Sequence, residues 1–306
     1  MPGYFGVGAF AELERALHDA AKWLASRGAN TSVGRVGSYM RTMRELVVAH
    51  EAGNATALTI EHANALYEAH DLISMHRAFE QGPYADLVAA RILKACSGPV
   101  LYRDENLKNA SNAARNFAFE LLVAERLIVG GASPHFPAHA DVGLSMSSAE
   151  LGIQCKRIFA SIDSGSVRRN FKDAEVGLQG AKDAGARGII AVDITRAANP
   201  QFLIPRAGGR EEVRTRLLEA SQNFINSNSR LWNQHKPGTI ALLTRVTALI
   251  ETDDAMFTHA QQYSLTPLNN ISDEEDAMVN EFSSVLAAAA AVDGRRSNAT
   301  TNAFKA

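Results

Sequence analysis

The chain has 306 residues, of which 46% are hydrophobic and 21% charged, a composition typical of one or two globular domains with a substantial buried core. Its 31 basic and 33 acidic residues give a net charge of −2, which excludes binding of nucleic acid through overall positive charge and leaves only local charged surfaces. The N-terminal stretch lacks a signal-peptide pattern, no apolar run is as long as a membrane span, and only two cysteines occur, so we expect a soluble, cytoplasmic protein with reduced thiols and no membrane partner.

The first third of the chain shows helical periodicity. Apolar residues recur at steps of three and four from Phe10 to Leu24, and Gly28 follows them as a helix stop. Similar patterns predict further helices over 38–50, 60–81 and 84–96. Because no strand pattern occurs in this part, we predict an all-helical N-terminal subdomain over 1–108.

The remainder alternates between strand and helix patterns. A strong helix pattern over 113–129 precedes two alternating segments, at 139–146 and 150–158, which predict a β-hairpin. The following patterns predict a helix over 167–182, a strand over 188–195, a helix over 211–234 and a strand over 239–251. Strands separated by helices of this length predict an α/β domain over 109–285, with a mixed or parallel sheet flanked by helices. We expect an Ala-rich helix and a polar, disordered tail over 286–306.

The hairpin brings polar side chains together. On its second strand, side-chain alternation directs Ile153 and Cys155 to the core and Gln154 and Lys156 to the opposite face. On its first strand, Asp141 falls on the polar face. If the hairpin turns at its serines, Asp141, Gln154 and Lys156 converge.

Alternation also pairs Ala140 with Val142 on the core face and places His139 beside Asp141. If these residues bind a phosphate group, His139 is expected to lie next to that phosphate or to the residues that hold it. A second interpretation uses His135, His139 and Asp141 as an H-x3-H-x-D transition-metal site, although no fourth cysteine or histidine lies near them.

A carboxylate, a side-chain carbonyl, a strand carbonyl and an ammonium group suit metal-assisted hydrolysis of a phosphodiester. Oxygen ligands hold Mg²⁺, and the lysine adds positive charge beside the developing anion. Glu120, in the preceding helix, supplies a further carboxylate, with Glu125 as a substitute. Taken alone, an aspartate and a lysine on adjacent strands, such as Asp141 and Lys156, more often form a surface ion pair than an active site.

The order of these residues resembles a known family. Phe119-Glu120 in a helix, Asp141 in a strand and then "IQCKR", Ile153 to Arg157, are similar to the PD-(D/E)XK nuclease superfamily, and most similar to its Mrr-type restriction endonuclease branch, whose signature uses Gln-x-Lys. The resemblance spans 109–195. It implies a restriction-endonuclease-like fold and Mg²⁺-dependent cleavage of DNA, with Mn²⁺ as a substitute, by an endonuclease of restriction or defence that acts as a homodimer.

The resemblance also implies roles for individual residues. Asp141 is the principal metal ligand, Gln154 replaces the usual second acidic ligand, and the Cys155 carbonyl coordinates as well. Lys156 is the catalytic lysine, and Glu120 is the helical acidic residue.

The neutral Gln154 departs from the common acidic pattern, and Asp141 is the single acidic residue of "HADVGLSM". Glu150 is a candidate neighbour that restores the missing acidity. The alternative function is therefore a catalytically inactive nuclease-like fold that binds nucleic acid or another protein.

A basic cluster follows the lysine strand. From Lys156 to Lys172 there are five basic residues and one acidic residue, a local charge of +4, which favours phosphate binding. The candidate nucleic-acid-binding residues are Arg157, Arg168, Arg169, Asn170, Lys172 and Gln179.

Overall fold

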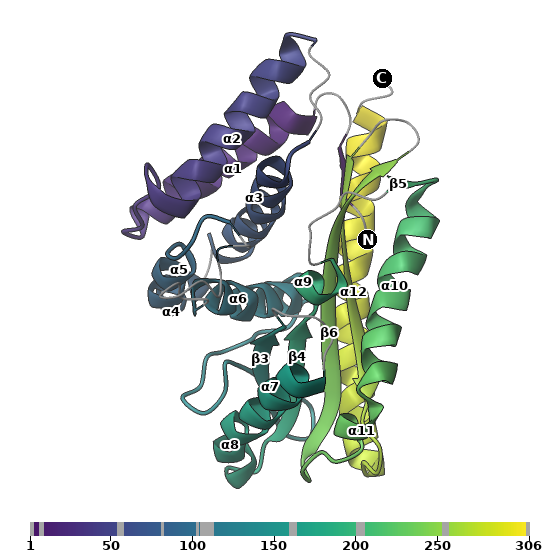
Figure 1. Ribbon diagram of the computed structural model, residues 1–306. Coiled ribbons are helices and arrows are strands. Elements are labelled where there is room, and N and C mark those ends of the chain that lie inside the picture. The colour runs from purple at the N-terminus through teal and green to yellow at the C-terminus, as the bar shows by residue number, and fades with distance from the viewer. Residues whose placement is uncertain are drawn as a thin grey trace.

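A computed structural model shows the fold and describes residues 3–5, 9–53, 58–80, 83–101, 104, 113–158, 164–199, 206–252 and 257–303. Over these residues the strands form a mixed sheet that is flanked by helices (Figure 1). The chain is therefore of mixed α/β class, as the sequence predicts. No helix in these ranges combines the length and the apolar character needed to cross a membrane.

Helices dominate the part of the chain before the hairpin. Its elements are β1 (Gly3–Phe5), α1 (Ala9–Ser26), α2 (Gly34–Glu51), α3 (Ile60–Phe79), α4 (Tyr84–Leu87), α5 (Ala89–Ala95) and α6 (Ala113–Val129). The predicted helices are confirmed, except that a turn at Val88 divides the last one before α6 into α4 and α5. The prediction of no strand here is wrong for β1, which is short and pairs with β7, the strand at Phe257–Pro267.

The sheet lies in the second part of the chain. Its other elements are β2 (Val142–Ser145), β3 (Glu150–Arg157), α7 (Ser164–Gly177), α8 (Gln179–Asp183), β4 (Arg187–Asp193), α9 (Thr195–Ala198), β5 (Arg206–Ala207), α10 (Arg210–Ser227), α11 (Ser229–Trp232), β6 (Thr239–Thr252) and α12 (Asp273–Ala303). The strand order is β1-β7-β6-β4-β3-β2, and β5 pairs with β6. The central strands β3, β4 and β6 run parallel, whereas β2, β7 and β1 are antiparallel to their neighbours.

The predicted β-hairpin is present as β2 and β3. Leu144 pairs with Leu151, and the backbone N–H of Met146 donates to the Ala149 carbonyl in the turn. Leu151, Ile153 and Cys155 lie in one buried cluster, so alternation assigned the core face of β3 correctly.

Helices cover both faces of the sheet. The helices α3, α6 and α12 pack against one face, and α1, α2 and α5 pack on α3 and α6 further from the sheet. All of these helices contribute to one apolar cluster with the strands. The other face is covered by α7, α10 and α11 around Phe171, Phe224 and Trp232. The described helices of the first 108 residues therefore belong to the same apolar cluster as the sheet.

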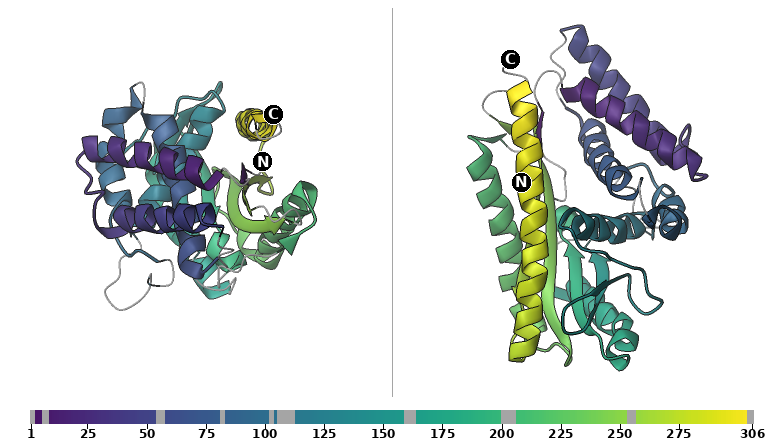
Figure 2. Two further views of the ribbon diagram at one scale, coloured as in Figure 1. Left: turned by 90° about the horizontal axis from the view of Figure 1, so that it is seen from above. Right: turned by 180° about the vertical axis from the view of Figure 1, so that it is seen from behind.

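The C-terminal helix α12 is longer than the predicted Ala-rich segment. It runs along the length of the sheet, as Figure 2 shows from behind. The sequence predicts an Ala-rich helix and a disordered tail over 286–306, whereas α12 begins at Asp273 and continues to Ala303. Alanine has the highest helix propensity, and a helix that is already nucleated extends at little cost.

A buried ionic network ties the helices together. The Glu68 carboxylate binds the guanidinium groups of Arg35 and Arg115, with 2.6 Å between Oε1 and the Nε of Arg115, and all three residues are at most 4% exposed. Tyr39 accepts hydrogen bonds from both arginines and donates to the Val100 carbonyl at 2.6 Å. Burial raises the pKa of Glu68, but the two arginines outweigh it and lower that pKa to about 2.

We expect Glu68→Gln to lower the free energy of unfolding by about 3 to 5 kcal/mol, because two arginines would remain buried beside a neutral amide. Urea denaturation at neutral pH measures the change. Glu80→Gln is the matched control, since Glu80 is exposed at the end of α3 and its ionic contact among the described residues is with His76. Its expected effect is below about 1 kcal/mol. Similar losses for the two variants would contradict this account of the network.

Candidate active site

The open edge of β3 provides the frame of the site. β2 pairs with β3 from Val142 opposite Ile153 onward, so β3 continues from Gln154 to Arg157 with no strand on that side among the described residues. The Asp141 carboxylate occupies the edge instead: its Oδ2 accepts from the Cys155 backbone N–H at 2.8 Å. A strand residue directs its N–H and C=O to the same side, so the Cys155 carbonyl also faces this edge.

Gln154 lies beside the same carboxylate. Its Nε2 donates to Asp141 Oδ2 at 2.6 Å, and the side chain is buried. The amide packs against α7 at Gly177, where an added Cβ would lie 2.6 Å from the amide oxygen. Glycine at 177 therefore leaves the space that the Gln154 amide fills.

Glu120 reaches the site from α6. This helix packs on the face of β3 that Ile153 and Cys155 share. The Glu120 side chain is 11% exposed, and its Oε2 accepts from Arg91 Nε at 3.3 Å. Arg91 is a residue that the sequence analysis missed, because it belongs to α5 and no local motif links it to the hairpin.

The charges of Glu120, Asp141, Arg91 and Lys156 influence the pKa values of the two carboxylates. Burial, and next the charge of Asp141, raise the pKa of Glu120 to about 7, while Arg91 and Lys156 act in the opposite direction. Burial also raises the pKa of Asp141, against the Cys155 N–H, Lys156, Arg91 and Gln154. The structure thus brings together Glu120, Asp141, Gln154 and Lys156, and it adds Arg91.

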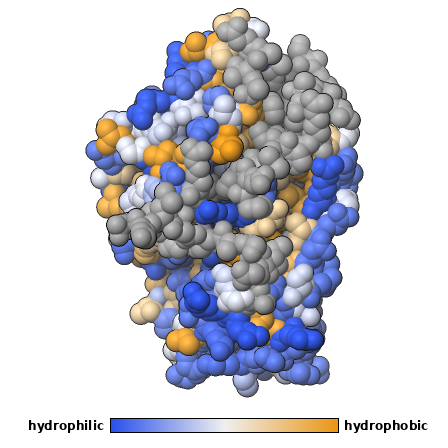
Figure 3. Space-filling model, in the orientation of Figure 1, coloured by the Kyte–Doolittle hydropathy of each residue, from blue (hydrophilic) through white to orange (hydrophobic). Residues whose placement is uncertain are grey.

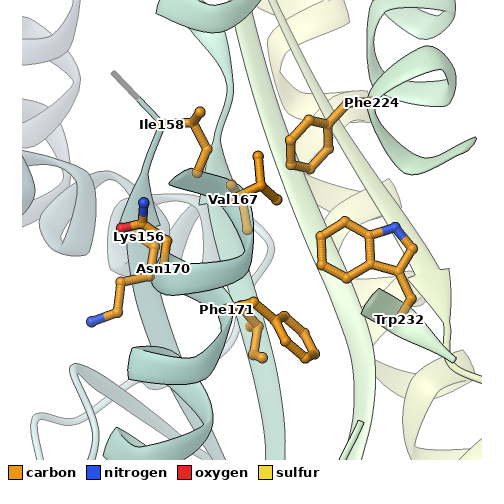
Figure 4. A pocket seen from close by; sticks show the side chains of 9 residues that line it. Lys156, Ile158, Val167, Asn170, Phe171, Phe224 and Trp232 are labelled. Carbon is orange, nitrogen blue, oxygen red and sulfur yellow. The ribbon is translucent and has the colours of Figure 1, made fainter. Parts of the chain in front are cut away.

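Lys156 is half-buried and extends from the face of β3 opposite Cys155. It lies next to Asn170 of α7 at one end of a small pocket (Figure 4). The polar ends of both side chains point away from Phe224 and Trp232 at the other end. Asn170 Nδ2 donates to the Ser166 carbonyl at 3.0 Å, which fixes its amide beside the lysine.

The carboxylates retain free oxygens for a cation. Within the described residues, Asp141 Oδ1 and Glu120 Oε1 accept no hydrogen bond. Together with the Cys155 carbonyl they form the oxygen set that a hard divalent ion prefers. Gln154 presents its nitrogen to Asp141, so its oxygen becomes a further ligand only after the amide rotates. No group of three or more His, Cys, Asp or Glu side chains in the described ranges is arranged to hold a metal.

Glu125 does not substitute for Glu120. It is buried, and burial raises its pKa to about 7, with Arg126, Asp293 and Arg245 as its charged neighbours. These groups lie on the side of α6 that faces α12 and β6. The Cys155 side chain is also buried, and burial raises the pKa of its thiol well above the ordinary value.

Arg157 is not available to nucleic acid. It is 5% exposed, and its Nε lies 3.8 Å from Asp193 Oδ2. It shares the core face of β3 with Ile153 and Cys155, as strand alternation requires. Its assignment as a nucleic-acid-binding residue is therefore wrong.

His139 and Glu150 lie elsewhere. Both line a separate depression near the start of β3, where Glu150 accepts from Ser145 Oγ and lies 3.8 Å from His135 Nε2. Glu150 is four residues from Gln154, about 13 Å along the strand, so it cannot restore the missing acidity. His139 packs against Gly180 of α8 rather than toward the carboxylates.

The chain before β2 bends, so alternation fails there. The Ala140 Cβ lies 3.3 Å from the position of a Cβ at Gly152, on the face opposite Ile153. The pairing of Ala140 with Val142 on the core face is therefore wrong. The bend directs Asp141 to the sheet edge and carries His135 onto Gly143, where the backbones form a bridge. His135, His139 and Asp141 consequently do not form a metal site.

The remaining basic residues lie on α7. Arg168, Arg169 and Lys172 are exposed, and hydrophilic residues dominate the lower front of the molecule, where α7 and α8 lie (Figure 3). Gln179 is exposed on α8 and donates to Asp183 at 2.8 Å, so its side chain is directed along its own helix and not toward the carboxylates.

No family model matches the chain, and neither a curated protein nor a solved structure matches it. The class of the site therefore rests on its geometry: a buried carboxylate (Glu120), a half-buried carboxylate (Asp141), an amide and two cationic side chains at the edge of a mixed sheet.

We expect a pH-dependent stability difference between Glu120→Gln and the wild type. A raised pKa means that the folded chain binds more protons than the unfolded chain between about pH 4.5 and 7, so stability falls as pH rises through that interval. Glutamine removes this dependence. From pH 5 to pH 8 the variant should gain about 1 to 3 kcal/mol relative to the wild type.

Urea denaturation at the two pH values measures this gain. Glu219→Gln serves as the control, because Glu219 is an exposed residue of α10. Its stability relative to the wild type should not change between pH 5 and pH 8. A constant difference between Glu120→Gln and the wild type would show that Glu120 titrates normally.

Proposed function

We propose that the chain is a Mg²⁺-dependent nuclease with a restriction-endonuclease-like core that cleaves DNA phosphodiester bonds as an endonuclease. The observation that carries this proposal is the convergence of Asp141, Gln154 and Lys156 with Glu120 at the open edge of β3. These residues come from α6, the bend before β2, and β3, which is the order that the PD-(D/E)XK resemblance implies.

Asp141, Glu120 and the Cys155 carbonyl would hold the Mg²⁺, and Mn²⁺ also accepts carboxylate and carbonyl oxygens in octahedral sites. When bound, the ion supplies Lewis-acid polarisation of the phosphate. Lys156 stabilises negative charge on the phosphate oxygens during cleavage. Burial and the charge of Asp141 raise the pKa of Glu120 to about 7 in the absence of a cation, and a bound cation would favour the ionised form that can ligate it.

The basic side chains on α7 would bind the DNA backbone beside these groups. Arg168, Arg169 and Lys172 are exposed on the helix that also supplies Asn170. Phosphate contacts position a duplex without selecting a sequence. Cleavage of both strands by a chain with one site requires two copies, so the proposal includes a homodimer.

A specific contact favours a second function. Asp141 Oδ2 already accepts two hydrogen bonds from the protein, one of them from the neutral Gln154. A chain in which these bonds persist would bind a cation weakly, and it would act as a nucleic-acid-binding or protein-interaction module without catalysis.

Cleavage of covalently closed plasmid tests the first function, because a circle has no ends for an exonuclease. With Mg²⁺ or Mn²⁺ we expect nicked and linear products from the wild type, and losses of at least about 100-fold in Asp141→Ala and Lys156→Ala. Glu219→Ala is the control for loss of a remote exposed carboxylate. Equal cleavage by all four proteins would reject this site, and DNA binding without cleavage would favour the second function.

Gln154→Glu tests how the amide limits cation binding. The substitution adds a second carboxylate next to Asp141 and removes the hydrogen-bond donor that occupies its Oδ2. We expect Mg²⁺ affinity to rise roughly tenfold, which corresponds to about 1.4 kcal/mol. Thermal unfolding with and without Mg²⁺ should then show a larger Mg²⁺-induced rise in Tm than in the wild type. A rise no larger than that of the wild type would contradict a role for Gln154 as a ligand position.

A further inference from the structure

Arg91 is held at the site by two contacts from different elements. Its Nε donates to Glu120 Oε2 at 3.3 Å, and its guanidinium carbon lies 4.4 Å from the centroid of the Phe136 ring. The side chain is 26% exposed. The carboxylate and the ring together restrict the position of a long side chain that would otherwise populate many rotamers.

The Nη groups of Arg91 remain available. Within the described residues, neither of them donates a hydrogen bond. The structural arginines of this protein behave differently: Arg245 donates from one Nη to Asp71 and from the other to Asp193, and Arg115 uses both its Nε and an Nη. Arg91 alone among these three keeps its planar pair of donors free at a partly exposed position.

Arg91 and Lys156 act on the same two carboxylates. Both lower the pKa of Glu120 and both lower the pKa of Asp141, against the effect of burial. Arg91 comes from α5, whereas Lys156 comes from β3 on the far side of the sheet edge. The two carboxylates are therefore stabilised in their ionised form by cationic side chains from two different parts of the chain.

We propose that Arg91 binds a phosphate of the nucleic acid through its two Nη groups, beside the oxygen ligands of Glu120 and Asp141. This inference rests on the proposed nuclease function and adds to it a phosphate-binding residue from the helical part of the chain. A guanidinium is permanently charged and matches two phosphate oxygens at once, which a lysine does not. Such a contact orients the phosphate as well as attracting it.

The test measures the affinity of a short fluorescent DNA duplex at several NaCl concentrations, with Ca²⁺ in place of Mg²⁺. Arg91→Met keeps the length and packing of the side chain and removes its charge. We expect about tenfold weaker binding and a salt dependence, the slope of log K against log [NaCl], that is smaller by about one. Arg91→Lys should recover the slope but only part of the affinity.

Lys94→Met is the matched control, since Lys94 is an exposed cation three residues further along the same helix, lying over the Phe117 ring. Its slope and affinity should remain close to those of the wild type. Equal DNA affinity and equal salt slope in Arg91→Met and Lys94→Met would overturn the inference. In that case, DNA binding by the wild type would still be consistent with the proposed function. Absence of DNA binding by the wild type would overturn both. If Arg91→Met fails to fold, wild-type affinity in Arg91→Lys decides against the inference.

Discussion

β2 ends its pairing with β3 at Val142, and the Asp141 carboxylate takes the hydrogen bond that another strand residue would have accepted. An unpaired N–H at a sheet edge needs a partner, and a carboxylate is a strong one. This bond fixes the carboxylate within reach of Gln154 on one side of the edge and of Glu120 on the other. Because the edge is open, side chains from both faces of the sheet can meet there.

Buried charges fix the helical part of the chain relative to the sheet. Arg245 of β6 binds Asp71 of α3 at 2.6 Å and Asp193 of β4 at 3.1 Å, and Glu68 binds arginines of α2 and α6. Burial raises the pKa of Asp71 to about 6 although Arg245 opposes it. Charges buried in this way cannot exchange partners without a large free-energy cost. Arg35 of this network also donates to the Ala95 carbonyl of α5 at 2.8 Å, which holds α5 in a defined position.

Local patterns predicted the elements that local physics determines. The hairpin, β4 and β6 have clear alternation or apolar runs, and α6 has a strong helical period. The sequence prediction missed β7, although Tyr263 and Leu265 alternate with Gln262 and Ser264 in its second half. Its first half shows no such alternation and pairs along β6.

The site was predictable as far as alternation within β3 holds. Alternation identifies Gln154 and Lys156 as residues of the site. It also places Arg157 on the core face, so the expectation that Arg157 binds nucleic acid followed from its charge alone. The bend at Ala140 lies outside any periodic pattern. Arg91 is 29 residues from its partner Glu120. Contacts of that separation are set by how α5 and α6 pack, which single-sequence periodicity does not report.

The neutral side chain at 154 gives the site a balanced charge. Burial and the charge of Asp141 raise the pKa of Glu120 to about 7, burial also raises the pKa of Asp141, and Arg91 and Lys156 oppose both shifts. If the proposed function holds, a polyanion that approaches this edge meets little repulsion before a divalent ion is bound. Thermodynamic linkage then requires that ion and polyanion change each other's affinity by the same factor. A site with three ionised carboxylates would repel the polyanion more strongly until its ion was bound.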